Sequence, residues 1–144
     1  MKRLLIVMIL NGLFLFSSST LAQHVYNYVR VCDYDEFWNV EKNRTETESS
    51  LRLVFRNGGE SVAVYSLLAG AWRSPTGLDP NFCYERNENG WDVYYQYQTI
   101  TGAVYSNYVY VKRDRSFVRF ALESKFADIG WKSIKAKSGY KLSR

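Results

Sequence analysis

Histidine is almost absent from this chain, since His24 is the single one in 144 residues. It lies next to the expected N-terminus of the mature protein, where order is usually poor. The sequence also contains no Gly-rich phosphate loop, no G-x-S-x-G or H-E-x-x-H motif and no calcium-binding loop. We therefore predict no metal, no cofactor and no catalytic residue. A small secreted hydrolase stays an alternative, because two carboxylates from distant strands can meet in space.

Long hydrophobic runs are scarce as well, and the one that is present, Leu4–Phe16, follows two basic residues. It is shorter than the roughly 20 apolar residues that a membrane-spanning helix needs. A polar segment follows it, and the small residues Thr20 and Ala22 suit the pockets of a signal peptidase. We predict that residues 1–22 are a cleaved signal peptide. Residues 23–144 would then form a single exported domain, periplasmic or secreted, that is not inserted in a membrane.

Cysteine occurs only twice, as Cys32 and Cys83. In an oxidising compartment, an even pair of cysteines in a small domain is typical of a disulfide. A catalytic thiol would need a base as its partner, and the sequence shows none. We predict a Cys32–Cys83 disulfide that ties the end of the first strand to a long loop.

Acidic residues are missing from the C-terminal segment. Residues 132–144 carry five basic residues and no acidic one, whereas residues 23–131 carry 12 basic and 14 acidic residues. A basic segment can bind phosphate or an anionic surface. The remainder of the chain offers no matching basic face, so we expect no nucleic-acid binding. We favour a solvated edge strand whose lysines discourage pairing with other sheets.

Strand patterns dominate the chain, and no amphipathic helix of real length is present. The clearest feature is a hairpin with Asn57, Gly58 and Gly59 at its turn. Asp33–Ser50 and Gly70–Gly90 have the composition of irregular segments, and the second contains both prolines. We predict an all-β fold, a small antiparallel barrel or sandwich of six to seven strands with one disulfide. The expected strands are Val25–Val31, Leu51–Arg56, Ser61–Leu68, Trp91–Ile100, Val104–Arg113, Ser116–Leu122 and Ser133–Leu142, with one helical turn inside Glu123–Gly130.

Aromatic residues are abundant, and tyrosines alternate along two of the expected strands. If Val93 and Val109 face the core, the residues that alternate with them along each strand form one outer face. Tyrosine beside glutamine and lysine suits recognition, because it combines rigid area with hydrogen bonds. In the competing interpretation both faces are buried and only hydroxyl groups reach solvent. The candidate binding residues are Tyr94, Gln96, Tyr108, Tyr110 and Lys112.

One short region is similar in outline to a known family. Thr101–Ser106 (TGAVYS), followed by Lys112 and Phe120–Leu122 (FAL), resembles the periplasmic lysozyme inhibitors of the membrane-bound or C-type group. Those proteins are small exported β-barrels with a disulfide, in which a Ser-Gly-x-x-Tyr segment and a later Trp-x-Lys enter the lysozyme cleft. Here threonine replaces the serine, and Tyr110 stands in place of the tryptophan. The resemblance would make Thr101, Tyr105 and Lys112 the inhibitory residues.

Three functions are compatible with these observations. The first is an exported β-domain that binds a macromolecule, as an inhibitor, an immunity-type protein or a cell-envelope accessory protein. The second is a carbohydrate-binding module that uses the tyrosine-rich face, and the third is the small hydrolase. The expected partner is therefore a protein or a polysaccharide. The sequence leaves open the identity of the partner, the oligomeric state and whether the source is bacterial or eukaryotic.

Overall fold

Most strands of this protein pair in antiparallel orientation with the strand that follows them in the chain. The computed structural model describes residues 21–74, 77 and 79–144. Two short 3-10 helices, η1 (Asn57–Gly59) and η2 (Ala127–Ile129), follow β2 and β8. The strands are β1 (Leu21–Tyr34), β2 (Val40–Arg56), β3 (Ser61–Leu68), β4 (Ala71–Arg73), β5 (Asn81–Glu88), β6 (Trp91–Ile100), β7 (Ala103–Lys112), β8 (Phe117–Phe126) and β9 (Ser133–Ser143).

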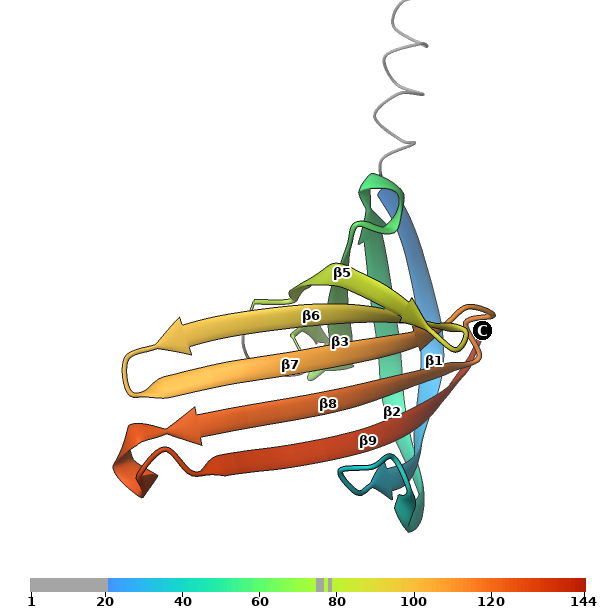
Figure 1. The fold of residues 1–144 in the computed structure, drawn as a ribbon. Coiled ribbons are helices and arrows are strands. Elements are labelled where there is room, and N and C mark those ends of the chain that lie inside the picture. Colours follow the sequence, from blue (N-terminus) through green and yellow to red (C-terminus); the bar gives the residue numbers. More distant parts are fainter. Residues whose placement is uncertain (1–20, 75–76, 78) are drawn as a thin grey trace, which may run out of the picture.

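Eight of these strands close into an up-and-down barrel. β1 to β3 and β5 to β9 are successive antiparallel neighbours, and β9 returns to pair with β1. Within the described residues, β4 pairs with β3 alone and extends one side of the barrel. Figure 1 shows β6 to β9 as a layer that crosses the long strands β1 and β2. The structure is thus all-β and antiparallel, but the predicted count of six to seven strands is wrong.

The strands that sequence analysis missed lie in the two segments predicted to be irregular. β2 begins at Val40, well before the predicted start at Leu51, and β5 occupies Asn81–Glu88. In β5 only Phe82 is buried, so the strand has no alternation of apolar and polar residues by which it could be recognised. β2 shows three register shifts against β1, and such bulges also interrupt a period of two.

The predicted hairpin and meander are confirmed. Leu51–Arg56 pairs with Ser61–Ser66 without a register shift, and Asn57, Gly58 and Gly59 all have positive φ values. β6, β7 and β8 pair in sequence, also without a shift. A single helical turn, η2, follows β8 as expected and ends at Gly130, whose φ is 69°.

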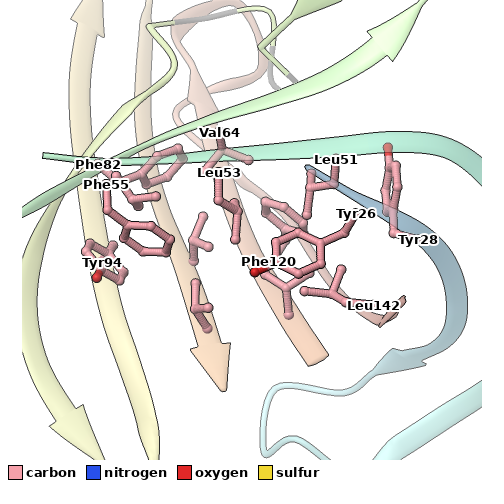
Figure 2. Close-up of a cluster of buried hydrophobic side chains, with 14 residues drawn as sticks. Tyr26, Tyr28, Leu51, Leu53, Phe55, Val64, Phe82, Tyr94, Phe120 and Leu142 are labelled. Atoms are coloured by element: carbon pink, nitrogen blue, oxygen red, sulfur yellow. The ribbon is translucent and has the colours of Figure 1, made fainter. Parts of the chain in front are cut away.

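The core fills the space between the two crossing layers (Figure 2). Tyrosine and phenylalanine side chains supply much of its volume, and the aliphatic residues of β2, β3, β7 and β8 pack between them. Leu142 of β9 and Tyr28 of β1 are directly paired and both buried, so the closing seam of the barrel is part of the core. The cluster comprises Tyr26, Tyr28, Leu51, Leu53, Phe55, Val62, Val64, Phe82, Tyr94, Val109, Val111, Val118, Phe120 and Leu142.

The predicted Cys32–Cys83 disulfide is wrong, because both cysteines are free. Cys32 is buried on β1 and Cys83 is exposed on β5, with β2 and β3 between the two strands. Cys32 packs instead beside Gly139 of β9. The prediction assumed that Cys83 lies in a loop that is free to approach β1. In the ladder Cys83 is paired with Tyr95, and a disulfide needs Cα atoms within roughly 7 Å.

The predicted signal peptide lies outside the described residues, apart from Leu21 and Ala22. These two residues begin β1, so cleavage after Ala22 would shorten that strand by its first two residues. No helix in the described part of the chain is both long enough and apolar enough to cross a membrane.

Candidate binding site

The segment between β1 and β2 forms a tight turn, Asp35–Asn39, that is built around the carboxylate of Asp35. The backbone N–H groups of Phe37 and Asn39 each donate to Oδ1 of Asp35 at 2.9 Å. The side-chain amide of Asn39 donates to Oδ2 at 3.1 Å. The hydrogen bond from the backbone of Asn39 is the main reason that the pKa of Asp35 lies below its usual value. The charged carboxylate therefore fixes the backbone of this segment, which we call the Asp35 turn.

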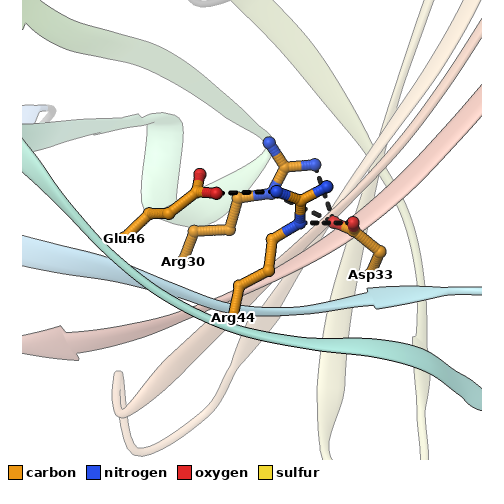
Figure 3. Close-up of polar contacts among 4 residues, drawn as sticks. All are labelled: Arg30, Asp33, Arg44 and Glu46. Carbon is orange, nitrogen blue, oxygen red and sulfur yellow. Dashed lines mark hydrogen bonds and ion pairs between the residues drawn. The ribbon is translucent and has the colours of Figure 1, made fainter.

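An ionic cluster ties β1 to β2 next to the Asp35 turn (Figure 3). Asp33 accepts a hydrogen bond from Nη2 of Arg30 at 2.7 Å and another from Nε of Arg44. Nη1 of Arg44 donates to Glu46 at 2.6 Å. Desolvation raises the pKa of Asp33, but the hydrogen bonds from Arg44 and Arg30 outweigh it and the net pKa is lowered. The cluster is partly exposed and contributes modestly to stability, while it fixes the strands that carry the turn.

The side chain of Trp38 points from the Asp35 turn toward the outer face of the barrel. Its φ of 65° is in the left-handed region, which costs a bulky residue roughly 1–2 kcal/mol. Aromatic packing offsets this cost, because the ring centroid lies 5.2 Å from that of Tyr34 and 5.0 Å from that of Tyr110. The guanidinium group of Arg119 lies 5.1 Å from the Trp38 centroid and also covers Tyr34 and Trp91. Such cation–π contacts hold the turn against the sheet.

The strand register explains why this aromatic cluster fits on the sheet. Tyr110, Arg119 and Gly139 are directly paired and form one row across β7, β8 and β9. A Cβ atom at position 139 would lie 2.8 Å from the ring of Tyr34 and 2.9 Å from Sγ of Cys32. Glycine therefore leaves the space that Tyr34 occupies, and Trp38 rests on Tyr34.

The next row of the outer face contains a groove. Tyr108, Ala121 and Lys137 are directly paired, and the short side chain of Ala121 lies between two long ones. The resulting hollow has a volume of about 290 Å³, at the lower end of the range for ligand pockets. Glu36 of the Asp35 turn borders it. This outer groove is lined by Glu36, Ser106, Tyr108, Tyr110, Ala121, Leu122, Glu123, Lys135 and Lys137.

Lys137 is held between the Asp35 turn and the groove. Its Nζ donates to the carbonyl oxygen of Glu36 at 2.7 Å and lies 4.3 Å from the centroid of the Trp38 ring. Burial lowers the pKa of Lys137 and raises the pKa values of Tyr108 and Tyr110. The groove thus combines a positioned ammonium group with neutral tyrosine hydroxyls, which can donate as well as accept hydrogen bonds.

Phe37 lies at the tip of the Asp35 turn, and 75% of its surface is exposed. The neighbouring Trp38 is half-buried, so the two aromatic residues of the turn have opposite environments. Because Asp35 accepts a hydrogen bond from the backbone of Phe37, the exposed ring is presented from an ordered support. Phenylalanine is one of the aromatic residues that are enriched in the cores of protein interfaces.

Of the five predicted binding residues, three lie on the outer face and two point into the barrel. Tyr108 and Tyr110 line the outer groove, and Lys112 is exposed at the end of β7. Tyr94 and Gln96 are only 2% and 7% exposed. The five residues therefore do not form one surface.

The predicted common face is wrong because of the turn between β6 and β7. The two-residue turn at Thr101–Gly102 pairs Tyr94 with Val109, and directly paired residues point to the same face. Tyr94 therefore shares the interior with Val109. Gln96 also lies inside, where it accepts a hydrogen bond from Asn107 at 3.3 Å.

The residues highlighted by the lysozyme-inhibitor resemblance are dispersed along β7. Thr101 lies in the turn before this strand and Lys112 at its far end, about 30 Å away for ten residues of β-strand. Tyr105 is paired with Gln98 on the inward-facing side. These three residues therefore do not converge on one site.

Sequence analysis missed Phe37, Trp38, Arg119 and Lys137 as parts of a site. A local signal for the turn was present, because Asp35 and Asn39 flank two large aromatic residues in a polar segment. The contact between Arg119 and Trp38 has no comparable signal, since it depends on pairing between strands that are distant in the sequence.

No family model, no curated protein and no solved structure matches this chain. In the described part of the protein, no group of three or more histidine, cysteine, aspartate or glutamate side chains is arranged to hold a metal ion. The Asp35 turn and the outer groove are therefore the features from which a function can be inferred.

Proposed function

We propose that this protein is an exported binding domain that recognises another protein through the Asp35 turn and the outer groove. The observation that carries the proposal is the position of Phe37, which is exposed on a hydrogen-bonded turn beside a groove lined by tyrosine and lysine. The features of residues 1–22 support the exported part of the proposal.

The chemistry of this surface suits a protein partner. Burial of an exposed phenylalanine side chain contributes about 1.5–3 kcal/mol, and the ordered turn lowers the entropic cost of binding. Tyr108 and Tyr110 add hydroxyl groups next to apolar ring surface, a combination that is frequent in recognition surfaces. Lys137 provides a cation that is already positioned by Glu36 and Trp38.

A polysaccharide fits this surface less well. Stacking on sugar rings requires flat and accessible aromatic faces, but the Tyr108 ring already packs against Tyr95, with 4.7 Å between centroids. Phe37, the most exposed aromatic residue of the surface, has no polar group that could bond to sugar hydroxyls. These two observations favour a protein over a carbohydrate.

The test compares capture of partners by matched variants of the mature domain. Phe37→Ala is expected to reduce retention of one specific protein at least tenfold, which corresponds to about 1.4 kcal/mol or more of lost binding energy. Leu68→Ala is the control, because it truncates a side chain of similar exposure, 63%, on β3. Circular dichroism and thermal melting verify that both variants fold. Equal retention by the wild type and Phe37→Ala, or retention on polysaccharide alone, would contradict the proposal.

A further inference from the structure

Strand β9 is paired on both sides over only part of its length. β8 pairs with it from Ser133 to Lys141, whereas β1 pairs with it from Ser138 to Ser143. Among the residues that the structure describes, no strand pairs with Ser133–Lys137 on the side away from β8. The first four residues of this free edge are exposed. Its outward backbone N–H and C=O groups are therefore open to another strand.

Two other incompletely paired strands, β2 and β5, have irregular edges. β2 contains an extra residue at each of its three register shifts against β1, and β5 contains one between Tyr84 and Arg86. Bulges twist a strand edge away and disrupt its ladder of hydrogen bonds. The pairing of β9 with β8 runs from Ser133 to Lys141 without a shift. The free edge of β9 is therefore regular enough to accept a partner strand.

The two faces of the free edge differ in chemistry. Lys135 and Lys137 line the outer groove, while Ile134 and Ala136 alternate with them on the inward-facing side. Ile134 is 56% exposed, so its apolar surface is largely uncovered. Residues 132–144 contain no acidic residue, and Glu123 of β8, which is directly paired with Lys135, contacts Ser133 and Lys125.

We propose that the partner contributes an extended polypeptide segment in which acidic and apolar residues alternate, and that this segment adds as a strand to Ser133–Lys137. The inference rests on the proposed function, since it specifies which part of the partner protein is recognised. Main-chain hydrogen bonds supply affinity in this mode of recognition, and alternate side chains supply specificity. Acidic side chains would lie beside Lys135 and Lys137, and apolar ones beside Ile134.

The lysines select against other occupants of the edge. Antiparallel pairing of two copies centred on residue 135 would place Lys135 opposite its counterpart, and like charges in that position are destabilising. Lysines on an edge also discourage unselective strand addition. The same residues that protect the isolated domain therefore favour an acidic segment.

The free edge is continuous with the Asp35 turn. Asp33 is the last residue of β1 that pairs with β9, opposite Ser138, and Glu36 is bonded to Lys137. An added strand would therefore continue the line of β1 and begin beside the turn that carries Phe37. One partner can contact Phe37 and the free edge together.

The test uses a nine-residue peptide of alternating valine and glutamate as the probe. Binding is expected to slow amide hydrogen exchange at least tenfold at alternate residues of Ser133–Lys137, as measured by NMR. Lys135→Glu is expected to weaken the affinity at least tenfold. Lys141→Glu makes the same charge change on the doubly paired part of β9 and should alter the affinity less than twofold. N-methylation of alternate peptide amides, or replacement of glutamate by lysine, is expected to abolish binding.

Several outcomes would overturn the inference. They are the absence of peptide binding, unchanged hydrogen exchange along Ser133–Lys137, equal affinity of the N-methylated peptide, and a dimer formed through β9 in sedimentation experiments. If Phe37→Ala reduces capture of a protein partner and Lys135→Glu does not, this inference is overturned and the proposed function stays intact. Peptide binding at the edge together with partner capture that ignores Phe37 would overturn the proposed function.

Discussion

Gly139 shows how one missing side chain determines what packs on the outer face. Tyr34 occupies the space that a Cβ atom at this position would need, and Trp38 packs on Tyr34 in turn. The requirement for glycine here is steric, because no left-handed backbone conformation is involved at this residue. A residue of no chemical function thus supports the Asp35 turn.

We predict that Gly139→Ala lowers the free energy of unfolding by about 1–3 kcal/mol, the usual cost of overpacking. The new methyl group would lie 2.8 Å from the Tyr34 ring and 2.9 Å from Sγ of Cys32. Urea denaturation measures the effect. In a Tyr34→Ala background most of the obstacle is gone, so the same substitution should cost much less. An equal cost in both backgrounds would show that Tyr34 is not the obstacle.

Tyr94 makes the stability of the barrel depend on pH in the alkaline range. Burial raises its pKa to about 12, whereas a tyrosine in an unfolded chain titrates near 10. The corresponding stability is complete below pH 10 and is lost as the pH rises from 10 to 12, because the unfolded chain releases its proton first. Tyr94→Phe is expected to reduce the loss of stability between pH 8 and pH 11, measured by urea midpoints. Tyr97→Phe, at a position that is 59% exposed, should leave that loss unchanged.

At the scale of elements, we expect the Asp35 turn both to hold Trp38 against the sheet and to bind the partner protein. Asp35→Ala removes the acceptor of the hydrogen bonds from Phe37 and Asn39. We predict a red shift of tryptophan fluorescence, as Trp38 loses its packing, and loss of partner capture. Asp114→Ala is the matched control, because Asp114 accepts an equivalent backbone hydrogen bond from Ser116 at 2.9 Å in the β7–β8 turn. Loss of capture in both variants would indicate a general effect on folding.

Strands were predictable from the sequence where residues of high β-propensity fill a segment between turn residues. β3 and β6 have the predicted bounds, because β-branched and aromatic residues dominate them and glycine-containing turns precede and follow them. β5 and the first half of β2 could not be recognised, since neither has an apolar face and β2 contains bulges. Their hydrogen bonds come from neighbouring strands rather than from a local pattern.

The candidate site was predictable only in part. The errors in the prediction concern how neighbouring strands pair. Tyr108 and Tyr110 were identified as outward-facing tyrosines, and both line the outer groove. Tyr94 lies on the opposite face, because the two-residue turn at Thr101–Gly102 pairs it with Val109, and the alternation within a single strand does not reveal this pairing. The contact of Arg119 with Trp38 depends on three-dimensional register, which one sequence does not contain.

At the scale of the whole molecule, the fold depends on the closure of β9 against β1. Leu142 is buried at this seam, directly opposite Tyr28. We predict that Leu142→Ala lowers the free energy of unfolding by about 2–5 kcal/mol, the range for deletion of a buried leucine side chain. Lys141→Ala changes the adjacent exposed residue and should have an effect within about 0.5 kcal/mol. Similar losses for both variants in urea denaturation would contradict a buried seam.

The closed barrel also determines what its cysteines can do. Because the β9–β1 ladder joins the ends of the sheet, closure requires no covalent link between Cys32 and Cys83. We predict that a thiol reagent labels one cysteine in the native protein, the exposed Cys83, and both in urea. Cys83→Ser should abolish the native signal. A disulfide typically stabilises a domain by about 2–4 kcal/mol, so its presence would appear as a clear fall of the urea midpoint on reduction. We expect the midpoint to stay constant, and a chain without free thiols in urea would overturn this prediction.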